Sequence, residues 1–224
     1  MKFYMSSRLR LGLALLGANA VSLVLYLIAG IDNSEFAYSY LVWNLFLAWI
    51  PLALVLWLAK VLRSRLWSNW LPLAITVAWV LFLPNSFYML TDYIHLYEVP
   101  RLYVLFDVVM FTSFILNGLM LGYLSLFLVH QEFLKRLSRR ASALLVGGVL
   151  LLASFAIYIG RDLRWNTWDI LFNPASVIFD VSDRIINPSA HPQVFSTTFS
   201  FFVLLASVYI VVWHMLRAAR TQKH

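Results

Sequence analysis

The stretch "WLPLAITVAWVLFLPNSFYMLTDYIHL", residues 70–96, starts as a continuous apolar run and ends with an acid and an imidazole three residues apart. Its first part, Trp70–Leu90, carries no charged side chain and has the length of about 20 residues that a helix needs to cross a bilayer. A bilayer core contains no water to hydrogen bond with backbone amides, so such a run must be helical. We therefore predict a transmembrane helix that delivers polar side chains to one membrane surface.

The rest of the chain has the same character. Of its 224 residues 62% are hydrophobic and only 12% are charged, against about a half and a quarter in soluble domains. The apolar runs are long and continuous, which excludes a transmembrane barrel with its short alternating strands. We predict one all-α membrane domain over residues 1–224, a bundle of six transmembrane helices with an outer loop at 160–193. The expected spans are 11–31, 40–62, 70–90, 102–129, 141–159 and 194–216. The apolar run continues past Ala18-Asn19-Ala20, so we expect a retained first helix and not a cleaved signal peptide.

Charges are distributed unequally over the loops between these spans. With the N-terminus in the cytoplasm, 13 of the 17 basic residues fall on the cytoplasmic side, as the positive-inside rule requires. All acidic residues except Glu132 fall at the outer ends of the helices or in the outer loops. We therefore expect a plasma-membrane protein with both termini in the cytoplasm. The net charge of +7 follows from this topology, and no nucleic-acid partner is needed to explain it.

A first group of polar residues follows Pro84. Proline removes a helix hydrogen bond, so we expect a kink or an interruption there, with Asn85 bonding to freed backbone groups or capping a second helix. If that second part is helical, Asn85, Tyr88, Asp92 and His95 share one face. Such a stripe must face a protein partner or a wet cavity. The alternative is a helix end that emerges among headgroups, where Asp92 and His95 are simply solvated.

Metal binding by this group has little support. Asp92 and His95 have the spacing of a helical ligand pair, but His191 is the only other histidine expected on the outer side, and the chain has no cysteine. The pair is half of a site, so we assign no metal.

A second group, "GRDLRWNTWDILFNP" at residues 160–174, combines arginines, acids, amides and tryptophans. Arginine suits bidentate recognition of phosphate, and tryptophan can hold a sugar or a headgroup with its ring face. We expect binding residues at Arg161, Arg164, Trp165, Asn166 and Trp168, with Asp169 nearby. The alternative is an interfacial helix whose arginines pair with acids such as Asp92 and Asp107.

Asp107 stands a few residues inside the fourth expected span. An acid at such a depth is a candidate functional residue by default. Its alternative role is that of a counter-ion to Arg161 or Arg164.

A third segment, "NPASVIFDVSDRIINP" at residues 173–188, predicts an amphipathic helix. Asn173 is a suitable N-cap with Pro174 at the first helical position, and Asn187-Pro188 ends the pattern. We expect this helix to lie on the outer leaflet. A lid over the site is the alternative.

Two polar motifs within this apolar context carry a resemblance. The patterns L-P-N-x-x-Y-x-x-T-D-x-x-H-L, residues 83–96, and G-R-x-L-R-W-N-x-W-D, residues 160–169, resemble an uncharacterised family of bacterial or archaeal polytopic membrane proteins. This resemblance implies a plasma-membrane protein of this size and a domain of unknown function. It implies no activity.

Three functions therefore stay open. In a binding protein, a polar outer pocket with Asn85, Tyr88 and the second group would hold an anionic lipid headgroup or a lipid-linked phosphate or glycan. In an enzyme of envelope lipid or glycan intermediates, Asp92 or His95 would be the acid/base, with Asp107 and Asp169 as orienting groups. In a small transporter or accessory subunit, the same residues would lock the helices together. Membrane lipids are the expected partners, along with a protein partner or a second copy of the chain, and no cofactor is indicated.

Overall fold

The computed structural model describes residues 7–33, 38–98, 104–165, 169–187 and 189–221, and every regular element in them is helical. Six helices are long and apolar enough to cross a membrane, which confirms the predicted all-α membrane fold. These helices are α1 (Ser7–Asn33), α2 (Ser39–Val61), α3 (Trp70–Tyr88) with its 3₁₀ extension η1 (Met89–Glu98), α4 (Val104–Leu134), α5 (Arg139–Asp162) and α8 (Pro192–Thr221). Two short helices, α6 (Asp169–Phe172) and α7 (Pro174–Ile186), lie between α5 and α8.

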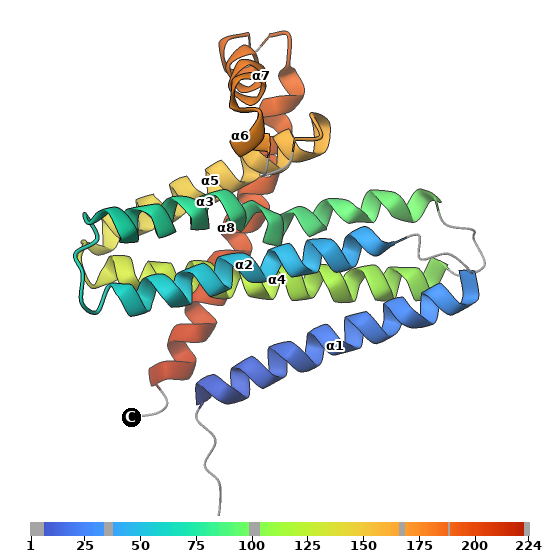
Figure 1. Cartoon of the computed structure of the whole chain (residues 1–224), viewed down its shortest axis with the longest axis horizontal. Coiled ribbons are helices and arrows are strands. Elements are labelled where there is room, and N and C mark those ends of the chain that lie inside the picture. Colours follow the sequence, from blue (N-terminus) through green and yellow to red (C-terminus); the bar gives the residue numbers. More distant parts are fainter. Residues whose placement is uncertain (1–6, 34–37, 99–103, 166–168, 188, 222–224) are drawn as a thin grey trace, which may run out of the picture.

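The helices are arranged around α4. In Figure 1, α2, α3 and α4 run side by side and α1 lies along their lower edge, against α4. α5 packs on α3 and continues toward α6 and α7, while α8 crosses behind the other helices and packs mainly on α5 (Figure 1). The start of α1 and the end of α8 lie on the same side of the molecule (Figure 1).

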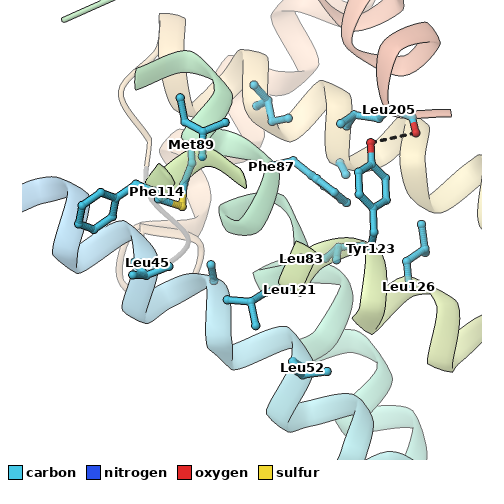
Figure 2. Close-up of a cluster of buried hydrophobic side chains, with 14 of the residues drawn as sticks. Leu45, Leu52, Leu83, Phe87, Met89, Phe114, Leu121, Tyr123, Leu126 and Leu205 are labelled. Atoms are coloured by element: carbon cyan, nitrogen blue, oxygen red, sulfur yellow. Dashed lines mark hydrogen bonds between the residues drawn. The ribbon is translucent and has the colours of Figure 1, made fainter. Parts of the chain in front are cut away.

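The core lies where α2, α3 and α4 meet. Leu45 and Leu52 of α2 and Leu83 and Phe87 of α3 pack around Leu121 of α4 (Figure 2). Tyr123 contributes its ring to this core, 5.0 Å from the Phe87 ring, and its hydroxyl donates to the Leu205 carbonyl of α8 at 3.2 Å (Figure 2). Lipid tails are as apolar as these side chains, so helix association in a bilayer depends on close packing and hydrogen bonds more than on burial. The buried bond from Trp79 Nε1 to Ser125 Oγ at 2.6 Å is a second such tie, between α3 and α4.

Two glycines allow α4 to approach α3 closely. A Cβ atom on Gly118 would lie 2.8 Å from the Ser86 carbonyl oxygen, and one on Gly122 would lie 2.8 Å from the Ser86 Cβ. Small residues four apart let membrane helices come into backbone contact. Ser86 also donates from its hydroxyl to the Ala48 carbonyl of α2 at 3.2 Å, so this point of α3 joins three helices.

A buried amide network attaches α1 to the bundle. Asn117 of α4 donates to Ser22 Oγ at 2.8 Å and to the Ala18 carbonyl at 3.0 Å. Asn19 donates to Asn117 Oδ1 at 3.4 Å and accepts a bond from Trp49 Nε1 at 3.1 Å. Leu15 and Ala29 of α1 are part of the core, but most of its large apolar side chains are exposed on the protein surface, so the amide network adds to a small apolar contact.

The helix break expected at Pro84 lies further along the chain. The α-helical pattern continues through Pro84 to Tyr88, and the 3₁₀ turn begins only at Met89. Asn85 donates to the Phe82 carbonyl at 3.1 Å, an added bond in the turn that lacks the proline N–H. The helix therefore tolerates the proline because side-chain bonds and neighbouring helices compensate for it.

Charge divides the molecule into two ends. The basic end is defined by residues 60–67, 132–140 and 213–217, where Arg136 bonds Glu132 Oε2 at 2.8 Å and lies 5.4 Å from the centre of the Trp67 ring. Arg136 also reaches the Leu62 carbonyl at 3.4 Å, which ties α4 to α2. The polar end is the opposite one and comprises the start of α2, η1, the start of α4, and residues 160–165, 169–187 and 189–191.

The close approach of α3 and α4 predicts a specific cost for added volume. Gly118→Ala places a methyl group against backbone that cannot move away, and should destabilise the protein by about 1–3 kcal/mol. Gly147→Ala on α5 is the matched control, because nothing lies within 4 Å of its Cβ position. Thermal unfolding of both variants in detergent checks this, and equal midpoints would contradict the close packing.

The predicted orientation can be tested on the same chain, because it contains no cysteine. Ser64→Cys at the basic end and Ser189→Cys at the polar end each introduce one thiol. A membrane-impermeant maleimide applied to intact cells should label the variant at position 189 and not the one at 64. The reverse result would invert the topology and move the polar end to the cytoplasm.

Candidate functional site

The side chains of the 3₁₀ segment η1 are aligned along the helix at every third residue. A 3₁₀ helix has three residues per turn, so side chains three apart eclipse one another. One such row contains Met89, Asp92 and His95. Met89 is fully buried and Asp92 is 1% exposed, whereas His95 is half-buried. The row therefore places the acid and the imidazole on one side of η1, the acid inside and the imidazole nearer the surface.

Asp92 is held by an amide of another helix. Asn44 of α2 donates from Nδ2 to Asp92 Oδ2 at 3.1 Å. His95 and Arg161 lie close enough to interact electrostatically with the same carboxylate. Arg161 Nη1 lies 3.5 Å from His95 Nε2, and the Tyr40 ring centre lies 5.0 Å from that of His95. Helices α2 and α5 and the segment η1 thus meet in one charged cluster.

A cavity of about 320 Å³ lies beside this cluster, between α2, α3, α5 and α7. Asn44 lines it and also bonds Asp92, so one side chain connects the cavity to the buried carboxylate. The cavity lies within the usual range of ligand pockets, roughly 300–1,000 Å³. Sequence reasoning missed Asn44, although a single amide in the apolar run of residues 40–62 is the signal that could have found it.

The lining of the cavity changes from apolar to polar along its length. The walls formed by Leu47 of α2, Val80 of α3 and Leu152 of α5 lie toward the middle of the helices. The polar lining residues lie toward the polar end, because α3 and α5 run toward that end and α2 runs away from it. These polar residues are Asn44, Asn85, Tyr88 and Trp165.

Helix α7 covers one side of the cavity. Val177 and Val181 are part of the lining, and Trp165 Nε1 donates to Asp180 Oδ2 at 2.8 Å. The chain reaches this position through Arg164, which has a left-handed φ of 59°. These contacts fit a lid, while the exposed apolar side chains of α7, such as Phe179 and Ile186, fit a helix on the leaflet, so both arrangements stay open. Asn173 is the N-cap of α7, Pro174 its first residue and Asn187 its C-cap, as the sequence predicts.

The exposed side of α7 holds a separate polar pair. Asp183 accepts bonds from Asn187 at 2.7 Å and from His191 Nε2 at 2.9 Å. These hydrogen bonds, first that of Asn187 and then that of His191, lower the pKa of the Asp183 carboxyl below its ordinary value. His191 is therefore engaged with α7 and not with Asp92 or His95. Within the described residues, no three histidine or acidic side chains come together as a metal site would require.

The expected site residues divide into three sets. Asn85, Tyr88 and Trp165 line the cavity, and Asp92, His95 and Arg161 form the adjacent cluster. The third set stands apart from both: Arg164 is exposed, Asp169 is partly exposed in α6, and Asp107 is 1% exposed, with no hydrogen-bond partner for its carboxylate among the described residues. Asn166 and Trp168 lie outside the described residues.

The expected alternative of arginine–acid pairing is not the arrangement found here. Within the described part of the chain, neither Arg161 nor Arg164 lies within ion-pair distance of an acid. Arg161 instead contacts His95 and lies near Asp92.

Comparison with known proteins identifies a family without an assigned activity. Residues 43–208 match the model of a family described as "Protein of unknown function (DUF1361)". This match confirms the resemblance to an uncharacterised family that the two polar motifs suggest. No curated protein and no solved structure matches the chain. The matched segment contains every residue of the cluster and the cavity lining except Tyr40.

The bond between Asn44 and Asp92 predicts a strong energetic coupling. Asn44→Leu leaves a buried carboxylate without its donor and should destabilise the protein by about 1.5–3 kcal/mol. Adding Asp92→Leu removes the unsatisfied group and should recover much of that loss. Unfolding free energies of the two single variants and the double variant give the coupling directly. Purely additive values would show that the two side chains do not depend on each other.

Proposed function

The chain belongs to the DUF1361 family, and we propose that it binds one amphipathic lipid in the cavity between α2, α3, α5 and α7. The head of this lipid, a glycan or a phosphate, would lie at the polar end of the cavity. The observation that carries the proposal is the gradient along the lining, from Leu47, Val80 and Leu152 to Asn44 and Tyr88. Only an amphiphile matches both parts of such a cavity.

The cavity volume limits how much of the lipid is held. About 320 Å³ is enough for a headgroup and the first part of one chain, and too small for a whole lipid. The deepest lining residues are apolar and lie midway along their helices. A transport path through the bundle would require polar lining beyond them, so binding fits the geometry better than transport.

The amide of Asn44 favours a head that carries hydroxyl groups. One hydrogen of its Nδ2 is donated to Asp92 at 3.1 Å, and the amide keeps its Oδ1 as an acceptor and a second N–H as a donor. Sugar and glycerol hydroxyls are donors of the kind that this oxygen accepts. Tyr88 of α3 is a second polar residue of the lining. Arg161, beside the cavity, and the exposed Arg164 would add the positive charge for a phosphate.

Catalysis has less support than binding. Asp92 and His95 are the candidate acid and base, but neither lines the cavity. A proton would have to pass from Asp92 to the ligand through Asn44, whose amide does not titrate. We therefore infer that Asp92 orients Asn44, and a hydrolase or transferase is the second candidate function.

The proposed setting is the plasma membrane of a bacterial or archaeal cell, with both termini cytoplasmic. The basic end supports this orientation through the positive-inside rule. The cavity would then open at the outer leaflet, where lipid-linked glycans and phosphates of the cell envelope are found.

Filling the cavity tests the proposal. Ala156 is a small lining residue of α5, and Ala156→Phe should displace the lipid. Leu144→Phe on the same helix is the control, because Leu144 is 77% exposed and does not line the cavity. Native mass spectrometry of the purified protein should show a bound lipid in the control and at least tenfold less in the Ala156 variant. Equal lipid occupancy in the two variants would refute the proposal.

Two further variants separate the glycan from the phosphate. Tyr88→Phe removes one neutral hydrogen bond and should weaken a glycolipid by about three- to tenfold. Arg161→Gln removes a charge-assisted contact and should weaken a phospholipid more than a glycolipid. Titration with a glycosyl diacylglycerol and with phosphatidylglycerol gives both comparisons.

A further inference from the structure

The cavity at the polar end is open on one side. Helix α3 packs against both α2 and α5, whereas α2 and α5 do not pack closely on each other. The cavity lies over α3 between these two helices, and α7 covers it at the polar end through Val177 and Val181. Two other lining residues, Trp43 of α2 and Leu152 of α5, are 53% and 57% exposed. Lining side chains that are so exposed border an opening of the cavity on the surface between α2 and α5.

The α3 wall of the cavity continues beyond this opening. Val80, Pro84 and Tyr88 line the cavity and follow one another at four-residue steps, which places them on one face of the helix. Val77 stands three residues before Val80 and belongs to the same face. It is 59% exposed and does not line the cavity. The face that forms the cavity wall therefore reaches the protein surface at Val77.

The α5 wall continues in the same way. Phe155 and Ile159 line the cavity four residues apart, and Leu152 precedes Phe155 by three residues on the same face. Gly148 comes one turn earlier, is exposed, and has no atom within 4 Å of its Cβ position, so a ligand can lie against the helix there. Val77, Gly148 and Leu152 thus form an apolar surface that extends the cavity, and we name these three residues the tail strip.

The tail strip has the direction and the depth of one membrane leaflet. Helices α3 and α5 both run toward the polar end, and Gly160 of α5 lies beside the Tyr88 ring, so the strip extends from the cavity toward the basic end. The eleven residues from Tyr88 to Val77 correspond to about 16 Å of helix, and half of a hydrocarbon core is about 15 Å. A lipid with its head at Tyr88 and its tail at Val77 therefore matches the leaflet at the polar end.

We propose that the cavity takes its lipid sideways from this leaflet, and that one hydrocarbon chain of the lipid lies along the tail strip. The inference rests on the proposed function, because a cavity of about 320 Å³ holds a head and only the first part of a chain. The rest of the chain must leave the cavity, and the opening between α2 and α5 keeps it among apolar groups.

Sideways entry has two consequences for the ligand. The lipid keeps the orientation that it has in the leaflet, so binding requires no transfer of its head across the bilayer. The ligand also needs at least one long chain, because a head without a chain would leave the tail strip unused. A free sugar or inorganic phosphate is therefore a poor ligand, and a lipid that carries the same head is a good one.

Photochemical labelling can locate the chain. The probe is whichever lipid binds the cavity more tightly, a glycosyl diacylglycerol or phosphatidylglycerol, with a diazirine near the end of one chain. On irradiation of the full-length protein in phosphatidylcholine nanodiscs, adducts should form mainly in segments 73–81 and 145–152, as mapped by mass spectrometry. Phosphatidylcholine with the same diazirine should also label α1 and α8, whose large apolar side chains are exposed. The same adduct distribution for both lipids would show only ordinary bilayer contact and overturn the tail strip.

A bulky side chain on the strip gives a second test. Val77→Trp should weaken a long-chain lipid by at least about fivefold, as expected when a close contact is overpacked, and should leave a short-chain lipid with the same head unchanged. Val21→Trp is the matched control, because Val21 of α1 is 57% exposed and does not line the cavity. Dissociation constants come from native mass spectrometry of the full chain. Equal effects at positions 77 and 21, or equal loss of both lipids, would contradict the inference.

The Ala156→Phe variant separates this inference from the proposed function. It should remove both the bound lipid and the adducts on the tail strip. Unchanged binding in this variant would refute the cavity as the lipid site, and the tail strip with it. Loss of binding, combined with wild-type adducts that show no preference for the strip, would support the lipid site and refute sideways entry alone.

Discussion

The backbone contact between α3 and α4 determines where the other elements of the polar end can lie. Gly118 and Gly122 leave no room for side chains against Ser86, so α3 lies directly on α4 at this level. Ser86 also bonds α2, which fixes the three helices at one height. Met89 also lies beside Gly118. It begins the 3₁₀ segment, in which Asp92 is buried and contacts Asn44 of α2. The Asn44–Asp92 bond and the cavity beside it are consequences of that placement.

Helix α5 contributes lining residues to a cavity at each end of the molecule. Its last turns supply Ala156, Ile159 and Gly160 to the cavity at the polar end, while Arg139 and Ala143 in its first turns belong to the cavity at the basic end. Gly160 allows the Tyr88 ring and the Trp165 carbonyl to come close, because a Cβ there would lie 3.1 Å from the ring. One helix thus contributes to two cavities of different chemistry, an amide and hydroxyl lining at one end and arginines with a histidine at the other.

The sequence predicted the helices well because a single property, the length of each apolar run, determines them in a bilayer. The site was less predictable. Asn85, Tyr88, Asp92 and His95 were expected on one face of a regular helix, but the change to a 3₁₀ segment at Met89 separates two cavity-lining residues from two in the cluster. Pro84 alone did not indicate this change, which depends on contacts with other helices. Asn44 was missed for a related reason, since only the fold brings α2 against η1. Arg164 was expected to bind; it has a left-handed backbone conformation and an exposed side chain, and its binding role stays a prediction.

The amide network of α1 has a consequence for the order in which the chain assembles. Asn19 and its partner Asn117 are 98 residues apart, and a ribosome makes the first long before the second. Until α4 arrives, the Asn19 amide can bond only the Leu15 carbonyl of its own helix, at 2.7 Å, and Trp49 of α2, at 3.1 Å. We therefore expect the first helix to be held during biosynthesis by this single bond to the second helix, and to dock fully only once the fourth has left the translocon.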